Sequence, residues 1–210
     1  MLYKIRNGLY KHFQNNFIIY FTMTIFLIIG IIIGAITIKI LNIEQKSQII
    51  GFFNSFFKML NNNDVNSLQL LKQSVLSNFK TILIIWITGM VVVGIPAIPI
   101  IVILRGCALG FTVGFLVNEF GTKGFLFSLL AVLPQNLFVI PGIISIASIG
   151  VGFSINNLKN KNRMLKNTFF KNILSYSLLI LFFSVVIFIG SIVEAYITPI
   201  FMKLIIEYIY

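Results

Sequence analysis

The side chains that could do chemistry are few in this chain and stand far apart. It has one histidine, His12, and one cysteine, Cys107, and its five acidic residues are scattered along 210 residues. A zinc site needs several such ligands at short spacings, and nucleophilic catalysis needs a base beside the nucleophile. No H-E-x-x-H, no G-x-S-x-G and no phosphate-binding loop occurs in the sequence. The residues therefore predict a chain that is not an enzyme and binds no metal or cofactor.

A pair of amides is the most costly polar feature of the sequence. Gln135 and Asn136 lie between Pro134 and Pro141 in a segment that is otherwise apolar. An amide in hydrocarbon costs free energy unless it is hydrogen-bonded. Two interpretations fit: the amides satisfy backbone groups freed by the prolines, or they line a polar path for a substrate or ion, as in transporters with broken helices.

Three charged residues are expected at the borders of apolar segments. Arg105 and Glu119 are 14 residues apart, so they should mark opposite ends of one span. Glu194 is expected near the outer end of the last span. All three are interpreted first as interface residues whose charged groups reach the lipid headgroups, and they are also kept as candidate functional residues.

Glycines recur at a spacing that suits close helix packing. Gly106, Gly110 and Gly114 follow one another at intervals of four, and Gly30 and Gly34 repeat that interval. A glycine face lets a neighbouring helix approach closely and gain dispersion contacts that lipid would not supply. The spacing predicts helix packing within the chain, with a homodimer as the alternative.

The elements that carry these residues must lie in a membrane. The chain is 58% hydrophobic and 10% charged, and its mean hydropathy is +1.00. Between Thr81 and Phe153 only three side chains are charged, whereas a soluble helix must present a polar face to water. The basic residues behind the net charge of +11 are scattered at the borders of these segments. They indicate lipid headgroups and not nucleic acid as the partner.

The expected fold is an all-α integral membrane protein with about five transmembrane helices in a single domain, residues 1–210. The spans are expected at residues 17–38, 81–103, 106–120, 124–153 and 172–195, followed by a tail helix at 199–210. The fourth segment is too long for one upright span. Because Pro134 and Pro141 interrupt it, we expect either a half-helix followed by a full span or one kinked, tilted helix.

Residues 39–80 are the only long polar region and are predicted to form two short amphipathic helices. Apolar residues recur at helical spacing through Phe52, Phe53, Phe56 and Phe57. The pattern resumes after a loop that ends in Asp64, a candidate helix cap. These helices should either pack on the chain's own spans and on lipid, or dock on a partner. The four phenylalanines are the candidate partner-facing residues.

Lysine and arginine placement predicts the orientation. The short loop at 156–172 is densely basic, and basic density beside span ends marks the cytoplasmic side. The N-terminus is therefore expected inside and the C-terminus outside. All five acidic residues and the 39–80 region then fall on the outer side.

Three sequence runs resemble the stage II sporulation protein M family. They are LRGCALGFTVGF at 104–115, LPQN at 133–136 and EAYITP at 194–199. The similarity in length and span layout extends over essentially the whole chain. Matching of these runs singles out a set of positions for that family: Arg105, Gly106, Gly110, Pro134, Gln135, Asn136, Glu194 and Pro199.

The resemblance implies a role in engulfment during endospore formation. Members of that family act in the mother-cell membrane with stage II sporulation proteins D and P, which cut peptidoglycan outside it. The resemblance thus implies a scaffold that assembles and localises these hydrolases without being one. The alternative that the residues leave open is a transporter or flippase-like conduit through Gln135 and Asn136.

Overall fold

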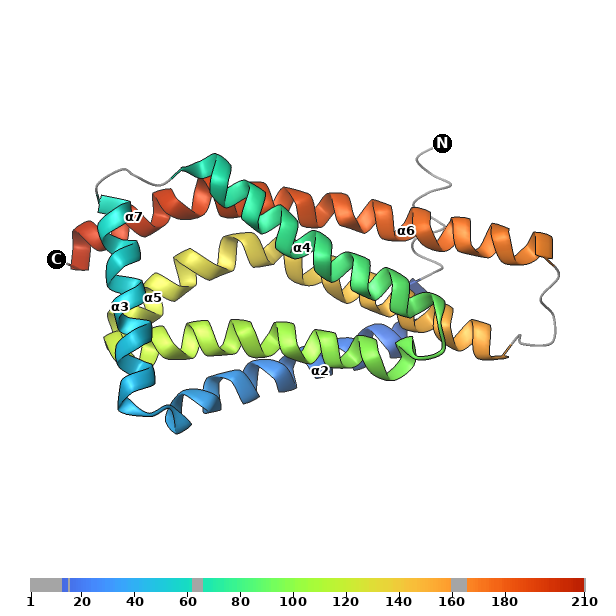
Figure 1. The fold of residues 1–210 in the computed structure, drawn as a ribbon, viewed down its shortest axis with the longest axis horizontal. Coiled ribbons are helices and arrows are strands. Elements are labelled where there is room, and N and C mark those ends of the chain that lie inside the picture. The colour runs from blue at the N-terminus through green and yellow to red at the C-terminus, as the bar shows by residue number, and fades with distance from the viewer. Residues whose placement is uncertain (1–12, 15, 62–65, 160–165, 210) are drawn as a thin grey trace.

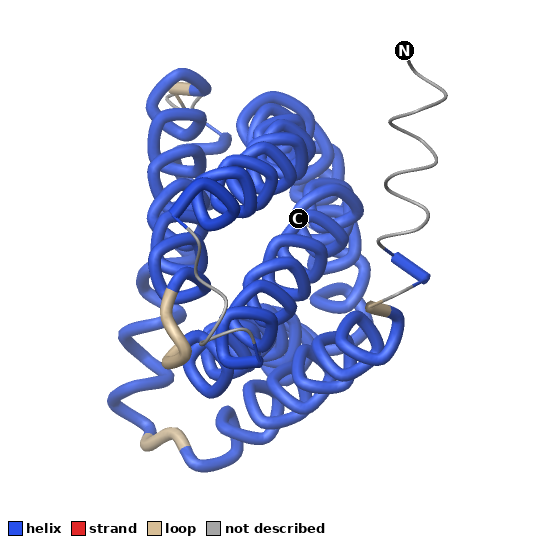
Figure 2. Tube along the Cα trace, turned by 90° about the vertical axis from the view of Figure 1, so that its right-hand side faces the viewer, coloured by secondary structure: helices blue, strands red, loops and turns tan. Residues whose placement is uncertain are grey.

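The fold is all-α, as expected. The computed structural model describes residues 13–14, 16–61, 66–159 and 166–209, and within them only helices and short connections occur (Figures 1 and 2). Four of the helical segments are long and apolar enough to cross a membrane. They are Phe17–Ile40, Ser67–Met90, Gly94–Lys159 and Asn172–Lys203.

The long helices lie side by side, and a short one crosses one end of the bundle (Figure 1). In chain order the elements are α2 (Phe17–Thr37), the 3₁₀ turn η1 (Ile38–Ile40), α3 (Ile43–Asn61), α4 (Ser67–Met90), α5 (Gly94–Lys159), α6 (Lys166–Ile192), the π-helical turn η3 (Val193–Ile197) and α7 (Thr198–Ile209). α3 is the crossing helix. The core of the bundle is a cluster of buried apolar side chains from α2, α4, α5 and α6.

The 66-residue α5 is a hairpin. Its backbone leaves helical geometry at Gly121, where φ is 59° and ψ is −135°, and the chain reverses direction there (Figure 1). Only glycine adopts this conformation without strain because it has no Cβ. We call residues 94–120 the first arm of α5 and residues 122–159 the second arm. The end of the bundle with this turn, α3 and α7 is called the Gly121 end, and the opposite end is called the Val91 end.

The connection between α4 and the first arm differs from the expectation. Hydropathy assigned 81–103 to one span, but α4 ends at Met90 and α5 begins at Gly94. The connection consists of Val91, Val92 and Val93, which gives no polar signal. Arg105, expected at the end of a span, therefore lies eleven residues inside the first arm.

The prolines do not divide the second arm into two helices. Pro134 and Pro141 both lie inside α5, whose non-helical residue is Gly121. Of the two paths expected for 124–153, the structure has the single helix, and it bends in the yellow part of Figure 1. A proline in a helix removes one backbone hydrogen bond and bends the helix without ending it when neighbouring helices support it.

The polar region at 39–80 forms one separate helix and the start of a long one. α3 is the first expected amphipathic helix, whereas the second is continuous with the span that follows it in α4. α4 is capped by Asn66, whose Oδ1 accepts hydrogen bonds from the backbone N–H groups of Leu68 and Gln69 at 3.1 and 3.4 Å. Asp64, the expected cap, lies outside the described residues.

Glycines bring α2 and the first arm into backbone contact. A Cβ at Gly30 would overlap the carbonyl of Ile103, and one at Gly34 would overlap that of Cys107. On the facing helix, a Cβ at Gly106 or Gly110 would meet the carbonyl of Leu27 or Ile31. The glycine faces of both helices are thus occupied within the chain, where a homodimer through them would need them free.

Candidate functional site

Arg105 hydrogen-bonds to α4 from inside the bundle. Its Nη2 donates to Asn78 Oδ1 at 2.9 Å, to Thr81 Oγ1 at 2.7 Å and to the backbone oxygen of Ser77 at 3.5 Å. A guanidinium in a membrane-spanning segment is stable only where such acceptors replace water. This position corrects the expectation that Arg105 is an interface anchor at the end of a helix.

The hydrogen bonds continue from α4 to α6. Asn78 donates from Nδ2 to Ser191 Oγ at 3.0 Å, and Ser191 donates to the backbone oxygen of Ile187 at 3.4 Å. Asn78 is 6% exposed and Ser191 is fully buried. One asparagine therefore accepts from a cation on the first arm of α5 and donates to a hydroxyl on α6.

Glu194 brings a negative charge to this group of hydrogen-bonded side chains. Its Oε2 accepts a short hydrogen bond from Ser74 Oγ of α4, and its carboxylate attracts Arg105 electrostatically. Glu194 lies in η3, where α6 widens by one residue into a π turn. Pro199 explains the widening in part, because it has no N–H to offer the carbonyl four residues before it, and such π turns are frequent at functional sites.

We call these six residues the polar network: Ser74, Asn78, Thr81, Arg105, Ser191 and Glu194. Their placement follows from helical periodicity, since the three residues of α4 share one face at i, i+4 and i+7. Arg105 and Glu194 were singled out from the sequence, whereas the other four were missed. The helical spacing of the three α4 residues could have indicated a shared polar face. It was overlooked because residues 39–80 were assigned to the outer surface.

The amide pair divides between two environments. Asn136 donates from Nδ2 to the backbone oxygen of Val132 at 2.7 Å, which is not one of the carbonyls that Pro134 and Pro141 leave free. Among the described residues, Gln135 Oε1 is enclosed and has no hydrogen-bond partner. The hydrogen bond of Asn136 therefore satisfies neither of the backbone carbonyls that the two prolines leave free.

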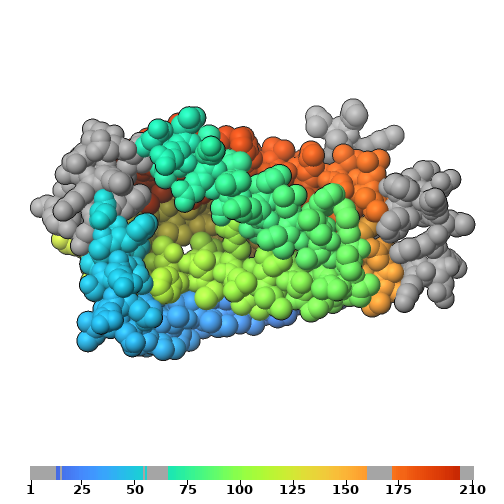
Figure 3. All heavy atoms as spheres, in the orientation of Figure 1, coloured from blue at the N-terminus to red at the C-terminus, as the bar shows by residue number. Residues whose placement is uncertain are grey.

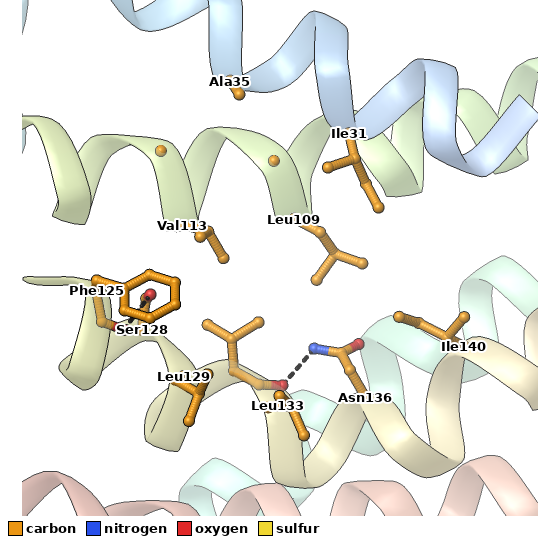
Figure 4. Close-up of a pocket in the computed structure, with 13 residues that line it drawn as sticks. Ile31, Ala35, Leu109, Val113, Phe125, Ser128, Leu129, Leu133, Asn136 and Ile140 are labelled. Carbon is orange, nitrogen blue, oxygen red and sulfur yellow. Dashed lines mark hydrogen bonds between the residues drawn. The ribbon is translucent and has the colours of Figure 1, made fainter.

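Two cavities meet at Asn136. The larger has a volume of about 340 Å³ and lies between α2 and the two arms of α5 (Figure 4). The smaller, of about 130 Å³, includes Arg105 in its lining. Leu109, Asn136 and Ile140 line both cavities, so the larger one, called the groove below, adjoins the smaller one, called the Arg105 chamber.

The phenylalanines of α3 face different directions. Phe53 stacks on the buried Phe115, with ring centroids 5.6 Å apart and planes 12° apart, whereas Phe52 is 71% exposed. Phe53 thus faces the bundle instead of a partner. The side chains of Phe56 and Phe57 lie outside the described part of the structure.

Glu119 joins the Gly121 turn to α3. Its Oε1 is 4.0 Å from Lys46 Nζ and accepts a hydrogen bond from Asn118 Nδ2 at 2.7 Å. A partly exposed ion pair at this distance contributes about 1 kcal/mol or less. Glu119 is therefore an attachment point for α3, together with the Phe53–Phe115 stack.

At the Val91 end, side chains that were not predicted from the sequence form hydrogen bonds between helices. Ser154 donates from Oγ to the backbone oxygens of Gly89 and Val91 at 2.8 and 2.9 Å, and Asn157 donates to that of Met90 at 3.2 Å. The carbonyls of Gly89 and Met90 are among those that the end of α4 leaves without helical partners, so these side chains satisfy them. Tyr176 of α6 donates to the backbone oxygen of Trp86 at 3.0 Å.

Comparison with known proteins gives one result that covers most of the chain. The sequence model of the family described as stage II sporulation protein M matches residues 23–199. No curated protein and no solved structure matches the chain. The matched range runs from α2 to the start of α7 and contains the polar network, the groove and the Arg105 chamber. The chain belongs to the stage II sporulation protein M family.

Proposed function

We propose that this chain is a membrane scaffold for engulfment in endospore formation, which assembles and localises peptidoglycan hydrolases at the mother-cell membrane. The family indicates a sporulation-related membrane protein. The proposed clients are stage II sporulation proteins D and P. In this proposal the chain is not itself an enzyme and crosses the membrane five times, since α5 counts as two passes, with the Gly121 end outside.

The observation that carries this proposal is the position of α3 across the Gly121 end. Figure 3 shows its described part covering one end of the bundle, where it lies against α7 and contacts the end of the first arm of α5. The Phe53–Phe115 stack and the Lys46–Glu119 pair hold it there, and Phe52 remains exposed. A held helix with an exposed aromatic side chain loses little conformational entropy on binding, which favours a docking role.

The polar network supports the same proposal. It joins α4, α5 and α6 by hydrogen bonds within the membrane-spanning part of the bundle. Helices joined in this way form a bundle of defined shape, and α3 packs at its Gly121 end.

Co-purification tests the scaffold. The chain is expressed with each hydrolase, membranes are solubilised, and the hydrolase recovered per mole of chain is measured. We expect recovery with the wild type and a severalfold loss with Phe52→Ala, because an exposed aromatic anchor at an interface carries much of the binding energy. Phe21→Ala is the matched control, since Phe21 is 58% exposed on α2 and away from α3.

Two outcomes would refute the proposal. The first is that the wild-type chain recovers neither hydrolase when both are present in the membrane. The second is that Phe52→Ala and Phe21→Ala lower recovery equally, which would remove α3 from the interface. An unchanged amount of folded chain, measured by size-exclusion chromatography, is required of both variants.

One observation favours a second function, a conduit for a polar substrate. Gln135 Oε1 is enclosed without a partner among the described residues, and an unsatisfied buried group is costly unless a ligand or water uses it. A conduit predicts flux of substrate into liposomes that contain this chain alone. Replacing Gln135 and Asn136 by Leu would abolish that flux, whereas under the scaffold proposal no flux occurs with either protein.

A further inference from the structure

Arg105 has hydrogen-bonding capacity that the network does not use. All three of its bonds come from Nη2, whereas a guanidinium carries five N–H donors. Nε and Nη1 have no hydrogen-bond partner among the described residues, and neither is an enclosed atom. Open space therefore adjoins the unused donors of a cation within the bundle.

The Arg105 chamber lies beside this side chain, and its lining comes from α2 and the two arms of α5. Besides Arg105, it is lined by Leu27 of α2, by residues of the first arm such as Thr112, and by Asn136 and apolar residues of the second arm. No residue of α4 or α6 is in its described lining. Glu194 bonds to Ser74 of α4 and is not among the residues that line the chamber.

The groove extends from the chamber toward the Gly121 end and suits an alkyl chain. Its lining is apolar apart from Ser128 and Asn136. The hydroxyl of Ser128 and the amide of Asn136 each donate to a backbone oxygen of their own helix. Leu133 and Phe125 on its edge are 44% and 51% exposed, so the groove opens where lipid surrounds the bundle. Figure 4 shows the Asn136 amide between Leu133 and Ile140, on the side of this space opposite Leu109.

The volumes fit one chain and a small head. The groove measures about 340 Å³ and the chamber about 130 Å³. A water-sized group takes about 30 Å³, and a methylene is of similar size, so the groove holds one alkyl chain of moderate length. The chamber has room for a carboxylate or phosphate group.

We propose that the groove and the Arg105 chamber together bind a single-chain anionic lipid, with an oxygen of its anionic group on the unused Nη1 of Arg105 and its alkyl chain along the groove. An N–H group of guanidinium forms a charge-assisted hydrogen bond to an oxygen of a carboxylate or phosphate. In low-dielectric surroundings these charge-assisted bonds are stronger than in water. The site is separate from α3, so it stands or falls independently of the scaffold function.

Binding of a fluorescent fatty acid tests this site. The full chain, purified in an uncharged sugar detergent, is titrated with dansyl-labelled undecanoic acid and with its uncharged methyl ester. We expect the acid to bind about tenfold or more tightly than the ester, since only the acid makes the charge-assisted bonds. Unlabelled alkyl phosphate should displace the acid, and inorganic phosphate should do so only at far higher concentration.

Two variants test separately the part of the site that would hold the anionic group and the part that would hold the alkyl chain. Arg105→Gln should remove the preference for acid over ester. Val113→Phe fills the groove while leaving the network untouched, and it should weaken binding of both probes. Val117→Phe is the matched control on the same arm, because Val117 is 37% exposed and does not line the groove.

The proposal is overturned by any of three results. Equal affinity for acid and ester would show that Arg105 does not bind the head. Equal displacement by inorganic and alkyl phosphate would show that the groove does not bind the chain. Equal effects of Val113→Phe and Val117→Phe would place the probe elsewhere. Since the first two results need only the wild-type chain, they hold even if Arg105→Gln does not fold.

Discussion

Arg105 and Asn78 show how single side chains can join helices that share an apolar environment. Lipid offers no hydrophobic force between helices, so interhelical hydrogen bonds and close packing hold them together. Asn78 uses its carbonyl for Arg105 and its amide for Ser191. One residue of α4 thereby fixes the positions of both α5 and α6.

A double-mutant cycle between Asn78 and Ser191 measures that bond. We expect Asn78→Ala and Ser191→Ala each to destabilise the folded chain, with a coupling free energy of about 0.6 kcal/mol and at most about 1.7 kcal/mol, as for other hydrogen bonds in membranes. Reversible unfolding in mixed micelles gives the four free energies.

Ser148 supplies the control for this cycle. It is fully buried but bonds to Ile144 of its own helix, so Asn78→Ala and Ser148→Ala should add without coupling. Coupling of equal size in both cycles would show that a general loosening of the bundle, and not the Asn78–Ser191 bond, is being measured.

At the scale of the elements, the contact between α2 and the first arm predicts different losses of stability for two glycine replacements. A Cβ at Gly110 would meet the backbone of Ile31, whereas one at Gly114 would first meet Cδ1 of Ile38, the far end of a side chain. Gly110→Ala should therefore destabilise the chain by about 1–3 kcal/mol, as overpacking does. Gly114→Ala should cost less than about 1 kcal/mol, because a side chain yields more easily and alanine favours the helix. Unfolding free energies that are equal for the two variants would contradict this account of the contact.

The α5 hairpin depends on its turn in a similar way. At Gly121 φ is 59°, so Gly121→Ala should cost about 1–3 kcal/mol of stability. Gly51 is the control: it lies inside α3, and a Cβ there would meet nothing within 4 Å. Gly51→Ala should leave stability unchanged or raise it by up to about 1 kcal/mol. Melting in detergent measures both variants, and a loss with Gly51→Ala as large as that with Gly121→Ala would refute the role of positive φ.

An element could be predicted from the sequence where its pattern of polar and apolar residues differed from that of its neighbours. Membrane helices and the amphipathic α3 could be predicted because hydropathy and helical spacing report burial directly. The connection at Val91–Val93 could not, since an apolar turn looks like the span around it. That error moved Arg105 to a helix end, and assigning 39–80 to the surface hid Asn78. The network is a property of three helices packed together, which no single segment encodes.

At the scale of the molecule, the two ends of the bundle differ in how they are fastened. The Val91 end is held by side chains of α5 and α6 that bond to the carbonyls at the end of α4. The Gly121 end is held by a small apolar cluster around Leu116 and Phe127, to which Phe53 of α3 contributes. The exposed surface for partners is therefore expected at the Gly121 end.

The scaffold requires that this end face outward, and labelling of single cysteines tests the orientation. In a Cys107→Ala background, Ile43→Cys places a thiol at the start of α3, where Ile43 is 88% exposed. Lys159→Cys places one at the end of α5, on the opposite side of the bundle. A membrane-impermeant maleimide should label position 43 in intact cells and position 159 only after permeabilisation, because the dense basic loop beside residue 159 keeps that end in the cytoplasm. Labelling in the reverse pattern would put α3 inside the cell, where no cell-wall hydrolase could reach it.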